Sequence, residues 1–566
     1  MFDIPLFRDH ILENILKFNS TTLISRLWLP WLLVVAAVLA LAVWILRRPL
    51  KEGSWAGLFY DEQYKFNRRS PGNWWGLLFL TAAFVITGVY VFSLENSLFE
   101  SFDTMGFGTM RNMKEGVVPN FDTMRITPLA FWDLSTLYAV THNIYMIKSY
   151  LLAQLALAVV CMYCFFNYIP VARRLTMLAV LLLTPTMLQT AQIIFPDREI
   201  IIAVMLSLIC LRHFCRTQKF RWLTGFLFFM IVALYTKETC VLFYFGIVAA
   251  SVLYRIWQED ITPRSFLHPW RTLSKMPLEV LLGIGLFSFL VIYSLFIPSN
   301  EENLYLSFNQ SSSLQEFIRY YGFELSLLTA AVVVLLWQMQ KHSDSRINPM
   351  FRGGGLLVGG ISVAAGMMIL GLIPKTWHLY GKTYYLLLPT LFALAWLFQN
   401  MRNFVVLTLV SVTILAYSAR ADIIGYTSEE GHYYRQIADF MAQQRQEATQ
   451  EPVNIFLIER PCPDERQIWA FETWNMAYHY YFYPYPMVFK TKFYNLKDLK
   501  RMLYNKIVYD KILYQYAYPM IPQSKPQTGD WVIIHKQNRE PDTLNIIKDL
   551  SEPSYENKLF EVYHAK

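Results

Sequence analysis

Long apolar runs recur along this 566-residue chain and constrain its fold more than any other feature. A helix needs about 20 apolar residues to cross a bilayer, and somewhat fewer suffice in a short span. Twelve segments fit this description: 28–46, 75–94, 144–166, 174–193, 200–214, 221–235, 239–256, 278–297, 323–340, 355–373, 384–399 and 403–419. Only 16% of the residues are charged, whereas soluble proteins carry about 25%. The sequence therefore predicts an α-helical polytopic membrane protein with about 11–13 transmembrane helices.

Basic residues are unevenly shared between the two sides that these spans define. If the first span runs from outside to inside, twenty lysines and arginines lie in the inner loops. Eight lie in the outer loops between spans: Arg111, Lys114, Arg125, Arg198, Lys237, Arg319, Lys375 and Lys382. Cytoplasmic loops are enriched in basic residues, so this topology is favoured, and it places both chain ends outside the cytoplasm. The formal net charge of +8 is too small for this length to indicate a nucleic-acid binder.

Three parts of the chain are expected outside the bundle of spans. Residues 1–27 form an outer or interfacial segment. Residues 95–143 form a long outer loop within a transmembrane domain that covers 28–419. Residues 420–566 form a polar tail of domain size. In the tail, "VNIFLIE" and "WVIIHK" have the pattern of buried strands, and "YYRQIADFMAQQRQ" and "NLKDLKRMLYNKI" that of amphipathic helices. A C-terminal soluble α/β domain on the periplasmic side is therefore predicted.

One outer turn, "FPDRE", places three charges between two apolar runs: Asp197, Arg198 and Glu199. Pro196 suits the first position of a helix, and acidic residues are favoured in a first turn because the helix dipole is positive there. A well-formed helix start is therefore one interpretation. It does not explain Arg198, because a cation at that end of a helix is mildly unfavourable. A functional site is the second interpretation, since charges at a membrane boundary are costly and mark sites.

The long outer loop also begins with acidic residues. Glu95, Glu100 and Asp103 directly follow the second span, so we expect them at the outer membrane surface. Asp103 at the end of one span and Asp197 at the start of another can converge at one membrane depth. Such a pair suits removal of a proton from an acceptor hydroxyl, or the holding of a cation against a phosphate. A solvated acidic loop is the simpler alternative.

Two further outer turns carry cations. "YTKET" places Lys237 and Glu238 between two spans, and "PKTWHLYGKTYYLLLP" places Lys375, His378 and Lys382 at the mouth of two more. Basic residues here run against the general charge bias, which indicates an anionic ligand such as a lipid-linked phosphate. The structural alternatives are a local Lys–Glu pair at a hairpin tip and the snorkelling of long basic side chains.

In the order of these motifs over residues 75–420, the chain resembles the glycosyltransferase C superfamily. These multi-span enzymes take sugars from polyprenyl-phosphate carriers. The family's first outer loop, with an acidic residue and an arginine-bearing helix, is matched by Asp103 and "MRNMKEG". "FPDRE", "YTKET" and "HLYGKTYYLLLP" match later outer turns of the family, and many members carry a soluble outer domain at the C-terminus. The tail lacks the WWDYG signature of oligosaccharyltransferases, which argues against transfer of asparagine-linked glycans.

The resemblance implies roles for seven residues. It implies catalytic roles for Asp103, as base, and for its partner Asp197. The first loop lacks a clean Asp-Glu pair, so Glu100 or Glu95 is the alternative base. The resemblance also implies that four basic residues bind the donor phosphate: Arg198, Lys237, His378 and Lys382. No metal-ligand spacing is evident, and a divalent cation as cofactor stays open.

The expected function is transfer of a sugar from a polyprenyl-phosphate donor to a glycan, lipid or protein acceptor. It would take place on the periplasmic face of a bacterial cytoplasmic membrane, by inverting displacement at the anomeric carbon. Cations would stabilise the phosphate as its negative charge grows. One alternative is a glycan polymerase or ligase of the same fold. Another is a lipid-linked-sugar transporter or flippase, against which stand the lack of an internal repeat and the position of the charges at the outer edge. A third is a scaffold without catalytic activity.

Overall fold

The computed structural model of the chain describes these residues: 64–93, 133, 137, 140, 144–190, 197–237, 240–257, 276–296, 322–331, 333, 384–400, 407–413, 433, 436–437, 440–441, 443–444, 453–458, 487–491, 520–522, 525–536, 541–550 and 552–565. The predicted spans 28–46 and 355–373 and the N-terminal segment 1–27 lie outside them, as does most of the loop 95–143. The chain divides into two compact units. One consists of residues 1–91, 115–135 and 149–421, and the other of residues 92–114, 136–148 and 422–566. The predicted domain boundaries stay predictions.

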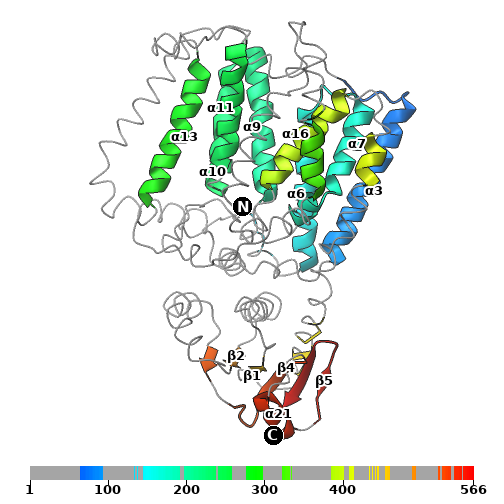
Figure 1. The fold of residues 1–566 in the computed structure, drawn as a ribbon, viewed down its shortest axis with the longest axis vertical. Helices are drawn as coiled ribbons and strands as arrows, with labels where there is room; N and C mark the ends of the chain where they lie inside the picture. The colour runs from blue at the N-terminus through cyan, green and yellow to red at the C-terminus, as the bar shows by residue number, and fades with distance from the viewer. Residues whose placement is uncertain are drawn as a thin grey trace. The chain divides into compact units, whose positions relative to one another are not determined.

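Helices make up most of the described chain before residue 420 (Figure 1). They are α3 (Pro71–Ser93), α6 (Ile144–Phe165), α7 (Val171–Leu182), α8 (Pro185–Thr190), α9 (Asp197–Thr217), α10 (Phe220–Thr236), α11 (Cys240–Trp257), α13 (Pro277–Phe296) and α16 (Tyr384–Asn400). A further helix covers Gly322–Ala331. Within the described ranges, three helical segments are long and apolar enough to cross a membrane: Pro71–Phe92, Tyr145–Phe165 and Asp197–Thr217. This agrees with the predicted association with a membrane.

Local sequence explains where several of these helices begin. The helices α3, α8 and α13 start at Pro71, Pro185 and Pro277. Proline suits the first helical position because its fixed φ fits a helix and its missing N–H has no partner there. The helix α9 instead has acidic residues in its first turn and Arg216 in its last turn. This arrangement of charges complements the helix dipole.

The predicted span 174–193 is not one continuous helix. It is divided into α7 and α8 by a break at Leu183 and Thr184. Pro185 explains the break, because proline supplies no backbone N–H and disfavours the helical conformation of the residue before it. The Thr184 hydroxyl then accepts a hydrogen bond from the backbone N–H of Met187 at 3.2 Å, as an N-cap residue does.

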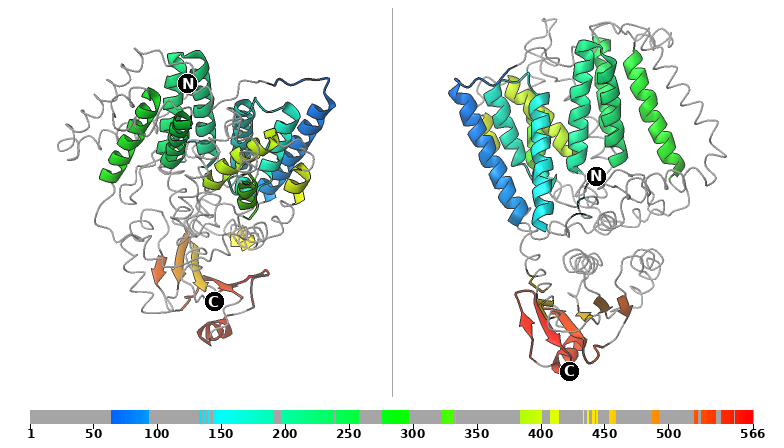
Figure 2. Two further views of the ribbon diagram at one scale, coloured as in Figure 1. Left: turned by 45° about the horizontal axis from the view of Figure 1, so that its top comes forward. Right: turned by 180° about the vertical axis from the view of Figure 1, so that it is seen from behind.

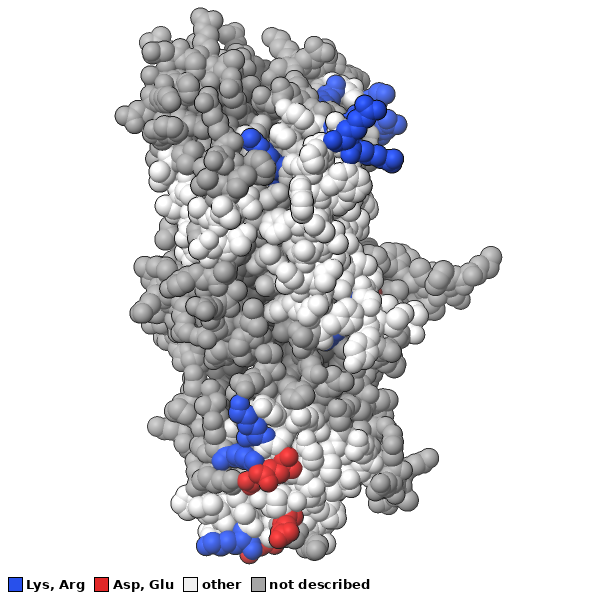
Figure 3. Space-filling view, turned by 90° about the vertical axis from the view of Figure 1, so that its right-hand side faces the viewer, with Lys and Arg blue, Asp and Glu red and all other residues white. Residues whose placement is uncertain are grey.

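The helix α9 packs along α10 and also contacts α16, while α11 packs on α13 (Figures 1 and 2). In contrast, α3 leaves large apolar side chains exposed, among them Trp75 at 70% and Val89 at 65%. Figure 3 shows a flank of the helices with few charges on the described residues. A contiguous apolar face of this kind is costly in water and marks a surface that contacts lipid or protein.

Close packing between helices depends on glycine at two positions. A Cβ atom at Gly76 of α3 would lie 3.1 Å from the carbonyl oxygen of Ala172 and 3.1 Å from the Cβ atom of Leu175, both in α7. A Cβ atom at Gly225 of α10 would lie 3.0 Å from the sulfur of Cys210 in α9. Small residues let apolar helices approach closely where hydrophobic exclusion from water gives no help.

Two buried arginines fix the C-terminal end of α6. Arg174 donates to the carbonyl oxygen of Tyr163 at 3.1 Å and lies over its ring. Arg212 donates to the carbonyl oxygens of Cys164, at 3.1 Å, and Phe165. The last carbonyls of a helix have no partner within it, so these side chains satisfy them. In Figure 3, basic side chains gather at one end of the helical part.

The second unit contains a six-stranded sheet with the strand order β3-β2-β1-β4-β6-β5. The strands are β1 (Val453–Ile458), β2 (Met487–Thr491), β3 (Met520–Pro522), β4 (Trp531–His535), β5 (Tyr555–Glu556) and β6 (Phe560–His564), and the helix α21 (Pro541–Lys548) follows β4. The pairs β1–β2, β1–β4 and β2–β3 are parallel. The pairs β4–β6 and β5–β6 are antiparallel. The two strands predicted in "VNIFLIE" and "WVIIHK" are confirmed.

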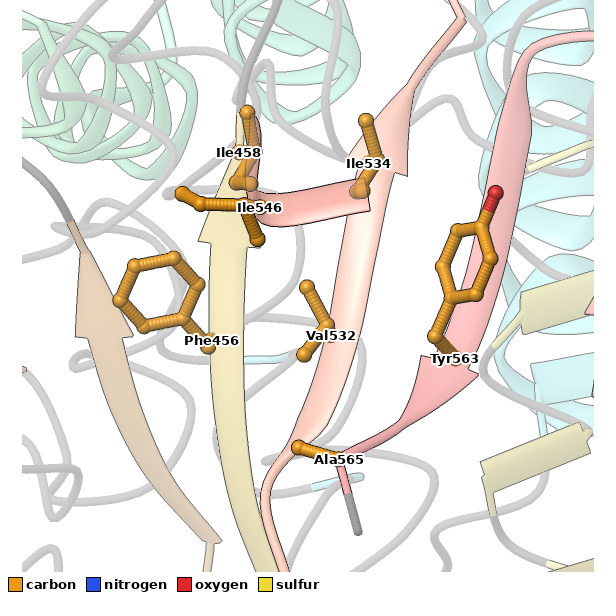
Figure 4. Close-up of a cluster of buried hydrophobic side chains, with 7 residues drawn as sticks. All are labelled: Phe456, Ile458, Val532, Ile534, Ile546, Tyr563 and Ala565. Atoms are coloured by element: carbon orange, nitrogen blue, oxygen red, sulfur yellow. The ribbon is translucent and has the colours of Figure 1, made fainter. Parts of the chain in front are cut away.

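The sheet has its own apolar core, shown in Figure 4. Phe456 of β1, Val532 of β4 and Ile546 of α21 belong to one buried cluster with Tyr563 of β6. The alternation of side chains along a strand places Phe456 and Ile458 on one face of β1, where α21 covers them. Of the two predicted helices in the tail, "YYRQIADFMAQQRQ" is helical at each position that the structure describes, and "NLKDLKRMLYNKI" lies outside the described residues.

Candidate functional site

A buried ion pair joins the start of α9 to the end of α10. These two helices are antiparallel neighbours linked by a short turn, so Asp197 at the start of one meets Lys237 directly after the other. The Lys237 ammonium nitrogen lies 3.3 Å from Asp197 Oδ1, and the two side chains are 5% and 0% exposed. The backbone of Lys237 also joins α10 to α11, because its N–H donates to Ala233 and its carbonyl accepts from the N–H of Cys240. The position of this lysine is therefore closely fixed.

The neighbouring residue, Arg198, is fully buried and connects α9 with α6 and α8. Its Nε donates to Gln154 Oε1 at 3.1 Å. Its Nη1 donates to the carbonyl oxygen of Thr190, the last residue of α8, at 2.9 Å. Hydrogen bonds from a guanidinium hold two acceptors in a fixed geometry. Arg198 therefore joins the start of α9 to the end of α8 and to the middle of α6.

The acceptor Gln154 also forms a hydrogen bond with Asp133. Its amide nitrogen donates to Asp133 Oδ2, while its amide oxygen accepts from Arg198. Tyr150, one helical turn earlier on α6, donates its hydroxyl to the same Oδ2 atom at 2.9 Å. The amide of glutamine is both a donor and an acceptor, so Gln154 links a cation to a carboxylate that precedes α6 in the chain.

Glu199 completes this group of side chains. Its carboxyl group lies within hydrogen-bonding reach of Asp133 and near the charges of Arg198 and Asp197. Both Glu199 oxygens are enclosed, and neither has a donor among the residues that the structure describes. The α9 cluster is defined here as seven residues: Asp133, Tyr150, Gln154, Asp197, Arg198, Glu199 and Lys237.

The α9 cluster combines two cations with three carboxyl groups in a largely enclosed site. Charged groups taken out of water are stable only when they are paired and hydrogen-bonded. The cations meet this condition through the Asp197–Lys237 pair and through Gln154 and Thr190 around Arg198. Such a site can hold an anion beside its cations, and can take up a proton on a carboxylate.

The structure describes three of the seven residues that the sequence assigned to the site. Asp197, Arg198 and Lys237 are all buried in the α9 cluster. The other four lie outside the described residues: Glu100, Asp103, His378 and Lys382. The catalytic and phosphate-binding roles of all seven stay predictions.

Sequence reasoning did not select four members of the cluster. Asp133, Tyr150 and Gln154 were not among the candidates, and Glu199 was noted as one of the three charges of "FPDRE" but was given no role. Gln154 did carry a signal, because it is a strongly polar side chain inside the apolar run "LLAQLALAVV". A polar residue within a membrane helix usually finds a partner in another helix.

Metal binding finds no support in the described part of the chain. Among these residues there is no group of three or more His, Cys, Asp and Glu side chains arranged to hold an ion. The divalent cation that the sequence leaves open would need ligands from other parts of the chain.

A second buried polar group lies at the break between α7 and α8. Glu324, which is fully buried, accepts a hydrogen bond from the backbone N–H of Thr186 at 3.1 Å. The hydroxyls of Thr184 and Thr186 lie 3.3 Å apart at the same place. A carboxylate here satisfies an N–H at the start of α8 that has no partner within the helix. The group therefore stabilises the helix break.

Comparisons with protein-family models, with curated proteins and with solved structures find no match to this chain.

Proposed function

We propose that this chain is an integral membrane glycosyltransferase that moves a sugar from a polyprenyl-phosphate donor to an acceptor on the periplasmic face of a bacterial cytoplasmic membrane. One observation carries the proposal. The turns "FPDRE" and "YTKET", selected as site motifs from sequence, contribute Asp197 and Lys237 to one buried ion pair at 3.3 Å. Arg198 lies directly beside this pair. Cations held at the end of apolar helices suit a phosphate on a lipid carrier.

The charge distribution along the helices supports the same proposal. Arg174 and Arg212 lie where α6 ends, and Asp197 and Lys237 lie where α9 begins and α10 ends. Because α9 runs from Asp197 toward Arg212, these two groups are separated by most of a membrane-crossing helix. The basic loops predicted on the cytoplasmic side would place the α9 cluster toward the outer face.

In the proposed reaction, the phosphate of the donor binds beside Lys237 and Arg198. It replaces carboxylates that lie beside these cations in the described structure. A carboxylate, with Asp103 as first candidate and Glu100 as second, accepts the proton of the acceptor hydroxyl. The acceptor oxygen forms a bond to the anomeric carbon, and the bond from that carbon to the phosphate oxygen breaks. The electron pair remains on the polyprenyl phosphate, where the cations stabilise it.

Lipid binding tests the phosphate site separately from the chemistry. Purified full-length protein is mixed with polyprenyl phosphate and analysed by native mass spectrometry, with polyprenol as the matched lipid that lacks the phosphate. We expect retention of polyprenyl phosphate over polyprenol, and loss of this preference in Lys237→Met. Lys536→Met, which changes a lysine of the sheet, serves as the control and should keep the preference. Equal retention of both lipids by the wild-type protein would contradict the proposed phosphate site.

Transfer itself is tested with a panel of polyprenyl-phosphate sugars and a membrane extract as the source of acceptors. Release of free polyprenyl phosphate is the readout. Asp103→Asn should abolish the release while the protein still inserts and elutes as the wild type does. Full release by this variant would remove Asp103 from the reaction, and full release by Asp103→Asn and Glu100→Gln together would refute the assigned base.

A lipid-linked-sugar transporter or flippase is the second candidate, and one observation favours it. The span that contains α7 and α8 is discontinuous, and the buried carboxylate of Glu324 lies at the break. Discontinuous helices often form the substrate and ion sites of transporters. Sealed vesicles that carry the protein distinguish the two candidates. Movement of the lipid-linked sugar across the bilayer without a new covalent product would favour transport.

A further inference from the structure

The contact between Asp133 and Glu199 requires an explanation that the proposed transfer does not supply. Asp133 is 6% exposed, and both donors that reach it, Tyr150 and Gln154, bind its Oδ2 atom. Its Oδ1 atom is enclosed and has no donor among the described residues. The same holds for both oxygens of Glu199. Three enclosed oxygens of these two neighbouring carboxyl groups therefore have no hydrogen bond to a donor in the described chain.

Two ionised carboxylates in this position would be strongly unfavourable. Each would lose its hydration, and the two negative charges would repel one another at short range. The nearby charges do not remove the problem. Two cations face three carboxyl groups: Lys237 is paired with Asp197, while Arg198 donates hydrogen bonds to Gln154 and Thr190 and also lies near both members of the pair. A single positive charge on the carboxyl pair would make the whole cluster neutral.

A proton fits this pair better than a metal ion does. Calcium requires six to eight oxygen ligands, and magnesium requires a nearly regular octahedron. No group of three acidic or metal-binding side chains is arranged for an ion within the described residues, and Tyr150 and Gln154 approach as donors. A proton needs only two oxygens within hydrogen-bonding reach of one another, which Asp133 and Glu199 supply.

We propose that Asp133 and Glu199 bind one proton between them and form a hydrogen-bonded carboxyl pair at neutral pH. The protonated carboxyl donates to an oxygen of the other, so that the proton supplies a hydrogen bond where the described chain offers the pair no further donor. The charged and titratable groups that face the pair are Tyr150 from α6 and Arg198 and Asp197 from α9. The inference stands on this geometry and does not require the transferase activity.

Infrared spectroscopy of the full-length protein in lipid nanodiscs tests the inference directly, because a protonated carboxyl group has a carbonyl stretch distinct from that of a carboxylate. We expect the wild-type spectrum minus that of Glu199→Gln to contain a protonated-carboxyl band with the intensity of a single group, shifted in D₂O. Asp133→Asn should give the same difference band. Glu556→Gln removes an ion-paired carboxylate of the sheet, far along the chain from the cluster, and it should leave the band in place.

Three results would overturn the inference. The first is the absence of the band at neutral pH from the wild-type spectrum, a measurement that needs no variant to fold. The second is persistence of the band in both Glu199→Gln and Asp133→Asn. The third is stoichiometric binding of Mg²⁺ or Mn²⁺ by the wild-type protein that both variants lose, which would make the pair a metal site. Because none of these readouts involves sugar transfer, failure of the carboxyl pair and failure of the proposed function are distinguishable.

Discussion

Removing the lysine of the buried ion pair should destabilise the protein far more than removing a lysine from an exposed pair. Lys237 Nζ lies 3.3 Å from Asp197 Oδ1, and both side chains are buried. At this distance and an effective dielectric constant of about 20, the attraction is about 5 kcal/mol. Lys237→Met keeps an apolar side chain of similar length but leaves the Asp197 carboxylate buried without its cation. Breaking one partner of a buried pair costs about 3–5 kcal/mol.

The chain offers a matched control in Lys536, which pairs with Glu556. Their side chains are 26% and 55% exposed, so solvent screens the attraction, and Lys536→Met should cost about 0–1 kcal/mol. The double variant Lys237→Met/Asp197→Leu removes both buried charges. It should recover most of the loss caused by Lys237→Met, because replacing a whole buried pair by apolar residues is often close to neutral.

Unfolding by denaturant in detergent micelles measures these differences. Each variant is compared with the wild type on the transition of the unit that carries the substitution, since the two lysines lie in different units. The reasoning would be refuted if Lys237→Met and Lys536→Met lost equal stability, or if the double variant were no more stable than Lys237→Met. Either result would mean that the Asp197 carboxylate is well solvated without its lysine.

Two other predictions concern packing. Gly76→Ala should destabilise the protein by about 1–3 kcal/mol, because its Cβ would meet a backbone carbonyl oxygen of α7 at 3.1 Å. The control Gly283→Ala, whose Cβ would meet nothing within 4 Å, should instead stabilise α13 by up to about 1 kcal/mol. Thermal unfolding compares the two variants. Phe456→Ala should lower the stability of the sheet unit by about 3–5 kcal/mol, whereas Leu544→Ala, at a 41% exposed site of α21, should lower it much less. Limited proteolysis of the sheet unit measures both. Equal losses of stability would contradict the assigned core.

Apolar length predicted the helices better than it predicted their continuity. The run 75–94 corresponds to α3 and the run 144–166 to α6, because an apolar segment of that length needs internal hydrogen bonds wherever it leaves water. The break before Pro185 carried a visible signal in the proline itself. A hydropathy profile does not reveal this helix break, because Thr184 and Pro185 interrupt the apolar run only briefly.

The site was partly predictable for a related physical reason. Asp197, Arg198 and Lys237 stood out because charges beside apolar runs are costly, and each one is buried in the structure. Gln154 carried a signal as a polar residue in an apolar run, but its pairing with Arg198 was not predictable, because the direction in which Gln154 points depends on how α6 is rotated against α9. Sequence periodicity does not define that rotation here, since α6 is apolar on all sides.

The sheet ends in very short strands on both sides. Among the described residues, its border strands are β3, with three residues, and β5, with two. Proline occupies one of the three positions of β3 and can donate no hydrogen bond from its nitrogen. Within the described strands, either margin thus offers only a few unused backbone groups to a foreign strand, which disfavours self-association by strand addition.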